Sequence, residues 1–146
     1  MQPEIHLSAG FFHTGLVVTD LDAAMAELSA ATGVSWRQVV DRTASMWSNS
    51  GVREVAYRRV FSVEGPPYLE LMETSAGYIW ETSGRGQTHH LGYWSEDVRE
   101  DARRFDAQGM ERVLADVDGS LFTVHRAKAG FFVELVSSSM REALVG

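Results

Sequence analysis

The chain contains the same short pattern twice, and this duplication limits the folds that it can adopt. Residues 13–21 and 90–98 each run from a histidine through Gly at +2 and Asp at +7 to an aliphatic residue at +8. A second pair of segments, 68–72 and 132–136, shares the order aromatic, aliphatic, Glu, Leu, aliphatic. Each half of the 146-residue chain therefore opens with a histidine on an apolar stretch and closes with a glutamate on another.

The first half predicts the element order β-α-β-β-β. Residues 11–18 alternate between two faces, as a strand does. Asp20 is a suitable helix N-cap, and Gly33 suits the residue that ends the helix. The remaining expected elements are a strand at 36–41, a loop or hairpin at 42–51, and strands at 53–63 and 68–72.

The second half predicts the same order again. A strand begins at His90, and a helix runs from Asp97 to Gly109. Strands are expected at 111–116, 121–126 and 131–137, followed by a tail or short helical turn at 140–146. We therefore expect an α+β fold in which two βαβββ modules form a curved mixed sheet with helices on its outer face. The expected organisation is a single domain, 1–146, with module one at about 11–74, a linker at 75–89 and module two at about 90–137.

Composition excludes several classes of function. The chain has no cysteine, so neither a disulfide scaffold nor a thiolate metal site is available. A net charge of −7 argues against a nucleic-acid partner, which requires a clustered basic face. No apolar run approaches the roughly 18 residues of a membrane span, and no signal peptide is evident. We expect a cytoplasmic protein that binds neither nucleic acid nor membrane.

The repeated histidines and glutamates predict a metal centre. A sheet with helices on one face leaves its other face free for a ligand, and two modules meeting edge to edge would bring the four side chains onto one surface. The expected ligands are His13, Glu70, His90 and Glu134. Two imidazoles and two carboxylates suit one divalent ion such as Zn²⁺, Ni²⁺, Co²⁺, Mn²⁺ or Fe²⁺. The alternative is that the histidines are satisfied core residues and the glutamates pair with Arg58, Arg59 or Arg126.

Other side chains are candidates for a substrate pocket. Trp94 shares a strand face with His90, and Trp47 and Trp80 lie in segments that could flank a cavity. These aromatic residues favour a bulky, partly apolar small molecule. Arg58 is the candidate anchor for an anionic group.

Two further histidines are left outside the site. His89 is expected to point away from the face that carries His90, and His125 is expected at the surface.

The order and spacing of these motifs resemble a known family. The segments HTGLVVTDLDAAM, PYLELME, HHLGYWSEDV and FFVELVS look like those of the vicinal oxygen chelate superfamily, which includes glyoxalase I, methylmalonyl-CoA epimerase, extradiol dioxygenases and bleomycin-resistance proteins. The resemblance covers about residues 11–137 and is greatest to the epimerase branch. It implies that His13, Glu70, His90 and Glu134 are the metal ligands.

Two positions depart from the epimerase pattern. The epimerases usually have Gln where this chain has Glu70, and a Glu-Gln pair where this chain reads Asn49-Ser50. Branch membership therefore does not identify the substrate.

Two classes of function follow from the resemblance. The first is a metal-dependent enzyme that moves a proton in an isomerase, epimerase or lyase reaction, with Glu134 as the base and Glu70 as the equivalent alternative. A non-haem iron dioxygenase is a variant of this class. The second class is a metal-free binding protein that sequesters a drug or metabolite. A homodimer is expected in either case.

Overall fold

The computed structural model describes residues 7–81 and 87–146, with side chains from His89 onward in the strand that starts at Gln87. Residues 82–86 of the expected linker lie outside this part of the chain. The elements of the first half are a 3-10 helix η1 (Leu7–Gly10), β1 (Phe11–Val18), α1 (Leu21–Thr32), β2 (Val40–Ser48), β3 (Gly51–Phe61) and β4 (Tyr68–Glu73). Those of the second half are β5 (Gln87–Ser95), α2 (Val98–Ala107), β6 (Glu111–Asp116), β7 (Phe122–Arg126), β8 (Phe132–Ser137), a 3-10 helix η2 (Ser138–Met140) and α3 (Arg141–Val145).

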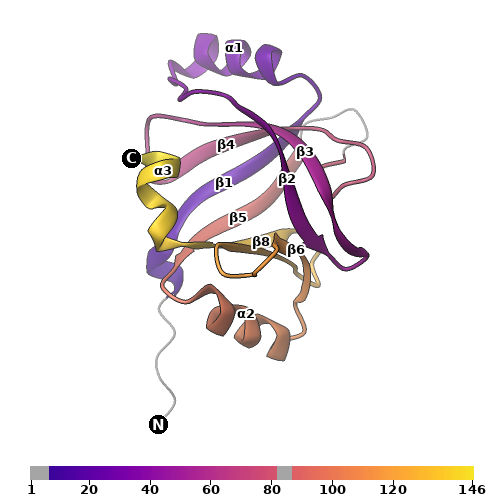
Figure 1. The fold of residues 1–146 in the computed structure, drawn as a ribbon. Helices are drawn as coiled ribbons and strands as arrows, with labels where there is room; N and C mark the ends of the chain where they lie inside the picture. Colours follow the sequence, from indigo (N-terminus) through magenta and orange to yellow (C-terminus); the bar gives the residue numbers. More distant parts are fainter. Residues whose placement is uncertain (1–6, 82–86) are drawn as a thin grey trace.

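The strands close into a barrel in the order β1-β4-β3-β2-β6-β7-β8-β5 (Figure 1). Within each half, the first and last strands pair in parallel, β1 with β4 and β5 with β8. The halves join through two antiparallel pairs, β1 with β5 and β2 with β6. The prediction of an α+β fold with two βαβββ modules and a mixed sheet is confirmed.

The two long helices cover the outside of the barrel at opposite ends of the view (Figure 1). Helix α1 packs through Leu21, Met25 and Leu28 onto apolar side chains of β1, β3 and β4. Helix α2 packs through Val98 and Ala102 onto β5 and β8. The helices cover one face of the strands, because alternate residues of a strand point to opposite faces.

Both helices begin at the expected N-cap residues and α1 ends at the expected Gly33, whereas α2 ends at Ala107, two residues before the expected Gly109. The side chain of Asp20 accepts a hydrogen bond from the amide of Ala23 at 3.0 Å, and that of Asp97 accepts one from Glu100 at 3.1 Å. Gly33 ends α1 in the left-handed conformation, with a φ of 77°. No helix in the described part of the chain is long and apolar enough to cross a membrane.

Of the predictions for residues 36–51, the hairpin is confirmed, whereas the strand at 36–41 is wrong. Trp36 makes an isolated bridge to Ser62, and the strand starts only at Val40 and forms the first arm of the hairpin. This segment is polar because most of its side chains are exposed. Pairing with β3, from Val40 opposite Arg59 to Ser48 opposite Gly51, stabilises the strand despite its polar composition.

His125 is completely buried, so its expected surface position was also wrong. Its Nδ1 lies 3.2 Å from the carbonyl oxygen of Met110, and its Nε2 lies 3.0 Å from Oγ1 of Thr123. Its ring makes an edge contact with Phe105 of α2. Because both ring nitrogens have partners, the imidazole is accommodated in the core.

Candidate metal centre

The pairing register of the central strands explains why His-x-Gly occurs twice. In the antiparallel pair β1–β5, His13 lies opposite Gly92, and Gly15 lies opposite His90. In the parallel pairs, Gly15 lies beside Glu70 and Gly92 beside Glu134. Each glycine therefore lies between a histidine and a glutamate on neighbouring strands, and nothing separates the two side chains.

Each imidazole occupies the space that a side chain at the facing glycine position would fill. A Cβ added to Gly92 would overlap the ring of His13, and one added to Gly15 would overlap the ring of His90. The two rings pack edge to face, with centroids 4.9 Å apart. The glycines thus let each module's histidine reach across the other module's strand.

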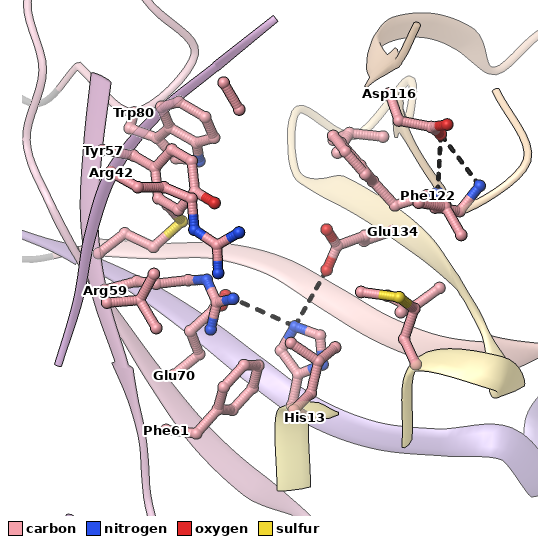
Figure 2. A pocket seen from close by; sticks show the side chains of 18 of the residues that line it. His13, Arg42, Tyr57, Arg59, Phe61, Glu70, Trp80, Asp116, Phe122 and Glu134 are labelled. Carbon is pink, nitrogen blue, oxygen red and sulfur yellow. Dashed lines mark hydrogen bonds and ion pairs between the residues drawn. The ribbon is translucent and has the colours of Figure 1, made fainter. Parts of the chain in front are cut away.

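Four polar atoms converge at this point. The Nε2 of His90 lies 2.9 Å from Oε1 of Glu70, and the Nε2 of His13 lies 3.2 Å from Oε1 of Glu134. The two Nε2 atoms are 2.9 Å apart. All four predicted ligands are thereby brought together within one chain, and their ligand atoms lie within 4.8 Å of one another. Figure 2 shows Glu70 and Glu134 on either side of His13.

The donor set fits a divalent metal ion. Ligand atoms about 2.1 Å from a common ion lie about 3.0–3.4 Å apart at bond angles of about 90–110°. The separations of 2.9–3.6 Å between histidine nitrogens and glutamate oxygens are close to this range. Nδ1 of His13 is buried without a hydrogen-bond partner among the described residues, so this ring interacts through Nε2. Neutral imidazole and carboxylate ligands suit Zn²⁺, Ni²⁺, Co²⁺, Mn²⁺ or Fe²⁺.

The electrostatics keep Glu70 ionised. Burial raises the pKa of its carboxyl, but the hydrogen bond from His90 and the positive charges of His13, His90 and Arg59 outweigh burial and lower the pKa to about 2. Burial likewise lowers the pKa of His90, but the hydrogen bond to Glu70 and the charges of Glu134 and Glu70 raise it above its usual value. A carboxylate held in this state is available to a cation and is a weak proton acceptor.

A third histidine belongs to the same group, contrary to the sequence-based expectation. Gly15 pairs with His90 and Leu16 with Thr88, so His89 is the extra residue of a β-bulge. The bulge breaks the alternation of faces and places His89 in the lining of the same cavity as His90. The histidine pair is visible in the sequence, but the bulge that brings both rings to one side is not.

His89 fixes the orientation of His90. Its Nε2 lies 2.9 Å from the carbonyl oxygen of Ile79, which only accepts, so Nε2 carries the hydrogen. Burial and the nearby charge of His90 lower the pKa of His89 to about 4, so the ring is neutral at pH 7. Its Nδ1 then accepts from Nδ1 of His90 at 2.8 Å, and Nε2 of His90 is directed at the other three ligands.

The four ligands lie at one side of a cavity of about 810 Å³. Its wall includes apolar side chains such as Met46 and Met72 and charged residues from β2, β3 and the segment before β2. Of the residues predicted to line a substrate pocket, Trp80 does so. It is buried and packs near Tyr57, with ring centroids 6.2 Å apart.

Trp94 and Trp47 lie outside the lining of this cavity. Trp94 stacks on Phe12 with ring centroids 3.6 Å apart, because the bulge between Phe11 and His13 turns Phe12 toward it. The guanidinium of Arg112 covers the ring of Trp47 at 4.2 Å. Both tryptophans therefore make packing contacts with other parts of the chain.

Arg58 also lies outside the cavity lining, and Arg59 takes the place expected for it. Arg58 makes ion pairs with Glu73 at 3.1 Å and with Asp22 and Asp41 at 3.4 Å. Neighbouring residues of a strand face opposite ways, so Arg59 shares the inner face with Tyr57 and Phe61. That alternation is visible in the sequence and is the signal that would have selected Arg59.

Comparison with known proteins agrees with this fold. Residues 12–138 match the family described as the Glyoxalase/Bleomycin resistance protein/Dioxygenase superfamily. No curated protein sequence gives a significant match.

Several solved structures share the fold. Methylmalonyl-CoA epimerase from Mycobacterium tuberculosis is 18% identical, with a TM-score of 0.68 over 97% of this chain and 96% of that one. A methylmalonyl-CoA epimerase in complex with methylmalonyl-CoA and NH4+ is 22% identical, with a TM-score of 0.63 over 89% and 94%. A variant of the Streptomyces coelicolor epimerase in complex with 2-nitronate-propionyl-CoA is 21% identical, with a TM-score of 0.63 over 89% and 97%. At these identities the likeness shows a common fold.

Replacing His90 with alanine is expected to lower bound divalent metal from about one ion per chain to well below half. The reason is that the substitution removes one of two imidazole ligands. Elemental analysis of the purified variant measures the effect. His125→Ala is the matched control, because it also removes a buried histidine but leaves the four ligands in place. Full metal content in the His90 variant would refute the assignment.

Gly92→Ala is expected to weaken metal binding about tenfold or more, because its Cβ displaces the ring of His13 from Glu134. A competition titration with a metal-chelating dye measures the change. Gly33→Ala serves as control, since it strains a left-handed residue far from the site and costs stability without altering the ligands. Equal metal affinity in the two variants contradicts the proposed role of Gly92.

Proposed function

The chain belongs to the Glyoxalase/Bleomycin resistance protein/Dioxygenase superfamily, and on this premise we propose that it is a divalent-metal-dependent enzyme that transfers a proton on a substrate chelated through oxygen. The reaction class is isomerase, epimerase or lyase. The observation that supports the proposal most directly is the complete set of two imidazoles and two carboxylates beside a cavity. A metal-free sequestering protein has no need for such a set.

His13, Glu70, His90 and Glu134 would hold one ion of the Zn, Ni, Co, Mn or Fe class. When bound, the ion would polarise a substrate carbonyl and stabilise the negative charge that develops on its oxygen. The chain itself supplies the ligands, holds His90 through His89, and provides the group that accepts the proton.

Glu134 is the better placed of the two candidate bases. Both side chains line the cavity, but that of Glu134 is 19% exposed, whereas that of Glu70 is 7% exposed. The pKa of Glu70 is lowered to about 2, which makes this carboxylate a weak base. Both carboxylates offer an oxygen to the ion. We therefore assign ligation alone to Glu70, and proton transfer in addition to Glu134.

The similar solved structures support a substrate with an acidic C–H bond next to a carbonyl. One of them contains methylmalonyl-CoA, and another contains 2-nitronate-propionyl-CoA. Because Glu70 replaces the glutamine typical of the epimerases, we extend to this chain the type of chemistry and leave the particular thioester open. The homodimer and the cytoplasmic location stay predictions, and a site built from one chain does not require a second subunit.

Glu134→Gln is expected to abolish proton transfer while leaving the fold intact, because the amide keeps the shape of the side chain but cannot accept the proton. The test follows deuterium uptake from heavy water into a panel of carbonyl compounds that includes methylmalonyl-CoA. The exchange rate should fall about 10²- to 10⁴-fold. Glu27→Gln, on the exposed face of α1, is the control and should exchange at the wild-type rate. An unchanged rate in the Glu134 variant would assign the base elsewhere.

A further inference from the structure

Two arginine side chains from neighbouring strands project into the cavity beside the metal group. Arg42 belongs to β2 and Arg59 to β3, and both line the cavity. Figure 2 shows their guanidinium groups close together, on the side of His13 where Glu70 lies. Among the side chains that the structure describes, 7–81 and 89–146, neither guanidinium has a hydrogen-bond acceptor. Their N–H donors are therefore available to a ligand.

Arg59 is the more constrained of the two. Its side chain is only 15% exposed, and its guanidinium carbon lies 5.4 Å from the ring centroid of Phe61 and 6.0 Å from that of Tyr57. Its Nε is 4.0 Å from Oε2 of Glu70, which is too long for a hydrogen bond. An arginine keeps its charge in a protein, and the N–H donors of Arg59, which lack a hydrogen-bond acceptor among the described side chains, open into the cavity.

The other charges around the cavity are already occupied. Asp116 accepts hydrogen bonds from the amides of Leu121 and Phe122, both at 3.0 Å. Asp41 pairs with Arg58 on the outer side. Arg37 donates to the carbonyl oxygens of the C-terminal residues, at 2.7 and 2.8 Å. Arg42 and Arg59 are thus the cavity arginines whose guanidinium groups lack a hydrogen-bond acceptor among the described side chains, and Arg59 has only the 4.0 Å ion pair with Glu70.

We propose that Arg59, assisted by Arg42, binds an oxyanion group of the substrate, either a carboxylate or a phosphate, next to the four predicted metal ligands. This inference names the substrate class of the proposed enzyme and rests on that proposed function. A guanidinium offers two parallel N–H groups that match the two oxygens of such an anion. The rings of Tyr57 and Phe61 hold the guanidinium in place, so little conformational freedom is lost when the anion binds.

The position of Arg59 also sets the direction in which the substrate lies. Arg59 is adjacent to Glu70, while Glu134 lies on the other side of His13 (Figure 2). A substrate anchored at Arg59 would extend past His13 and the other predicted metal ligands toward Glu134. The anion-binding residue and the base therefore contact different ends of the reacting part of the molecule.

The test measures binding of small anions by NMR titration of labelled protein, first stripped of metal and then loaded with Zn²⁺. The probes are succinate, inorganic phosphate and succinamide, which has the length of succinate but no charge. In metal-free protein, Arg59→Met is expected to weaken binding of the preferred anion about tenfold or more and to leave succinamide unaffected. Arg58→Met is the matched control, because it removes the same charge from the adjacent residue outside the cavity.

Arg42→Met is a second variant. Because Arg42 is exposed, this substitution is not expected to disturb folding. It should weaken the same anion by a smaller factor. Preference for succinate identifies a carboxylate site, and preference for phosphate identifies a phosphate site. Equal anion binding in wild type, Arg59→Met and Arg58→Met overturns the inference.

The outcome is separable from that of the proposed function. If Arg59→Met loses anion binding and the wild type binds no metal, the inference of an anion site is supported and the proposal of a metal-dependent enzyme is rejected. If the wild type has its normal metal content and anion binding does not depend on Arg59, the metal centre is supported and the anion site is rejected.

Discussion

The structure depends on the reciprocal packing of two histidines against two glycines across the β1–β5 pair. His13 lies over Gly92 and His90 over Gly15, so neither ring can move without leaving a gap in the sheet and neither glycine can gain a side chain. The same contact joins the two modules of the barrel. The pairing of β1 with β5, one of the two junctions that close the barrel, thus also brings the two histidines and two glutamates together.

This arrangement places negative charge where burial alone would exclude it. Glu70 is almost completely buried, and an isolated carboxylate there would be costly. Imidazoles and the nearby guanidinium of Arg59 offset this cost, and the charges collect on one wall of the cavity. Glu134 is more exposed than Glu70. Two equivalent positions of a duplicated chain therefore have different environments and suit different roles.

Sequence alone predicts the duplicated plan, the helix N-caps and the convergence of two histidines and two glutamates, because each rests on a local pattern that occurs twice. It fails where pairing overrides the local pattern. Residues 40–48 are polar but form a strand through their hairpin with β3. A bulge turns His89 into the site, and His125 is buried because the core supplies partners for both nitrogens. The choice of Arg58 over Arg59 was an error of one residue, which reverses the face of a strand.

The most direct test of the account is anomalous diffraction from crystals of the protein grown with cobalt or zinc. A metal centre formed by the four side chains predicts one strong peak about 2.0–2.2 Å from Nε2 of His13 and of His90 and from a carboxylate oxygen of Glu70 and of Glu134. A peak bound by other residues, or no peak with the four side chains turned apart, would contradict it.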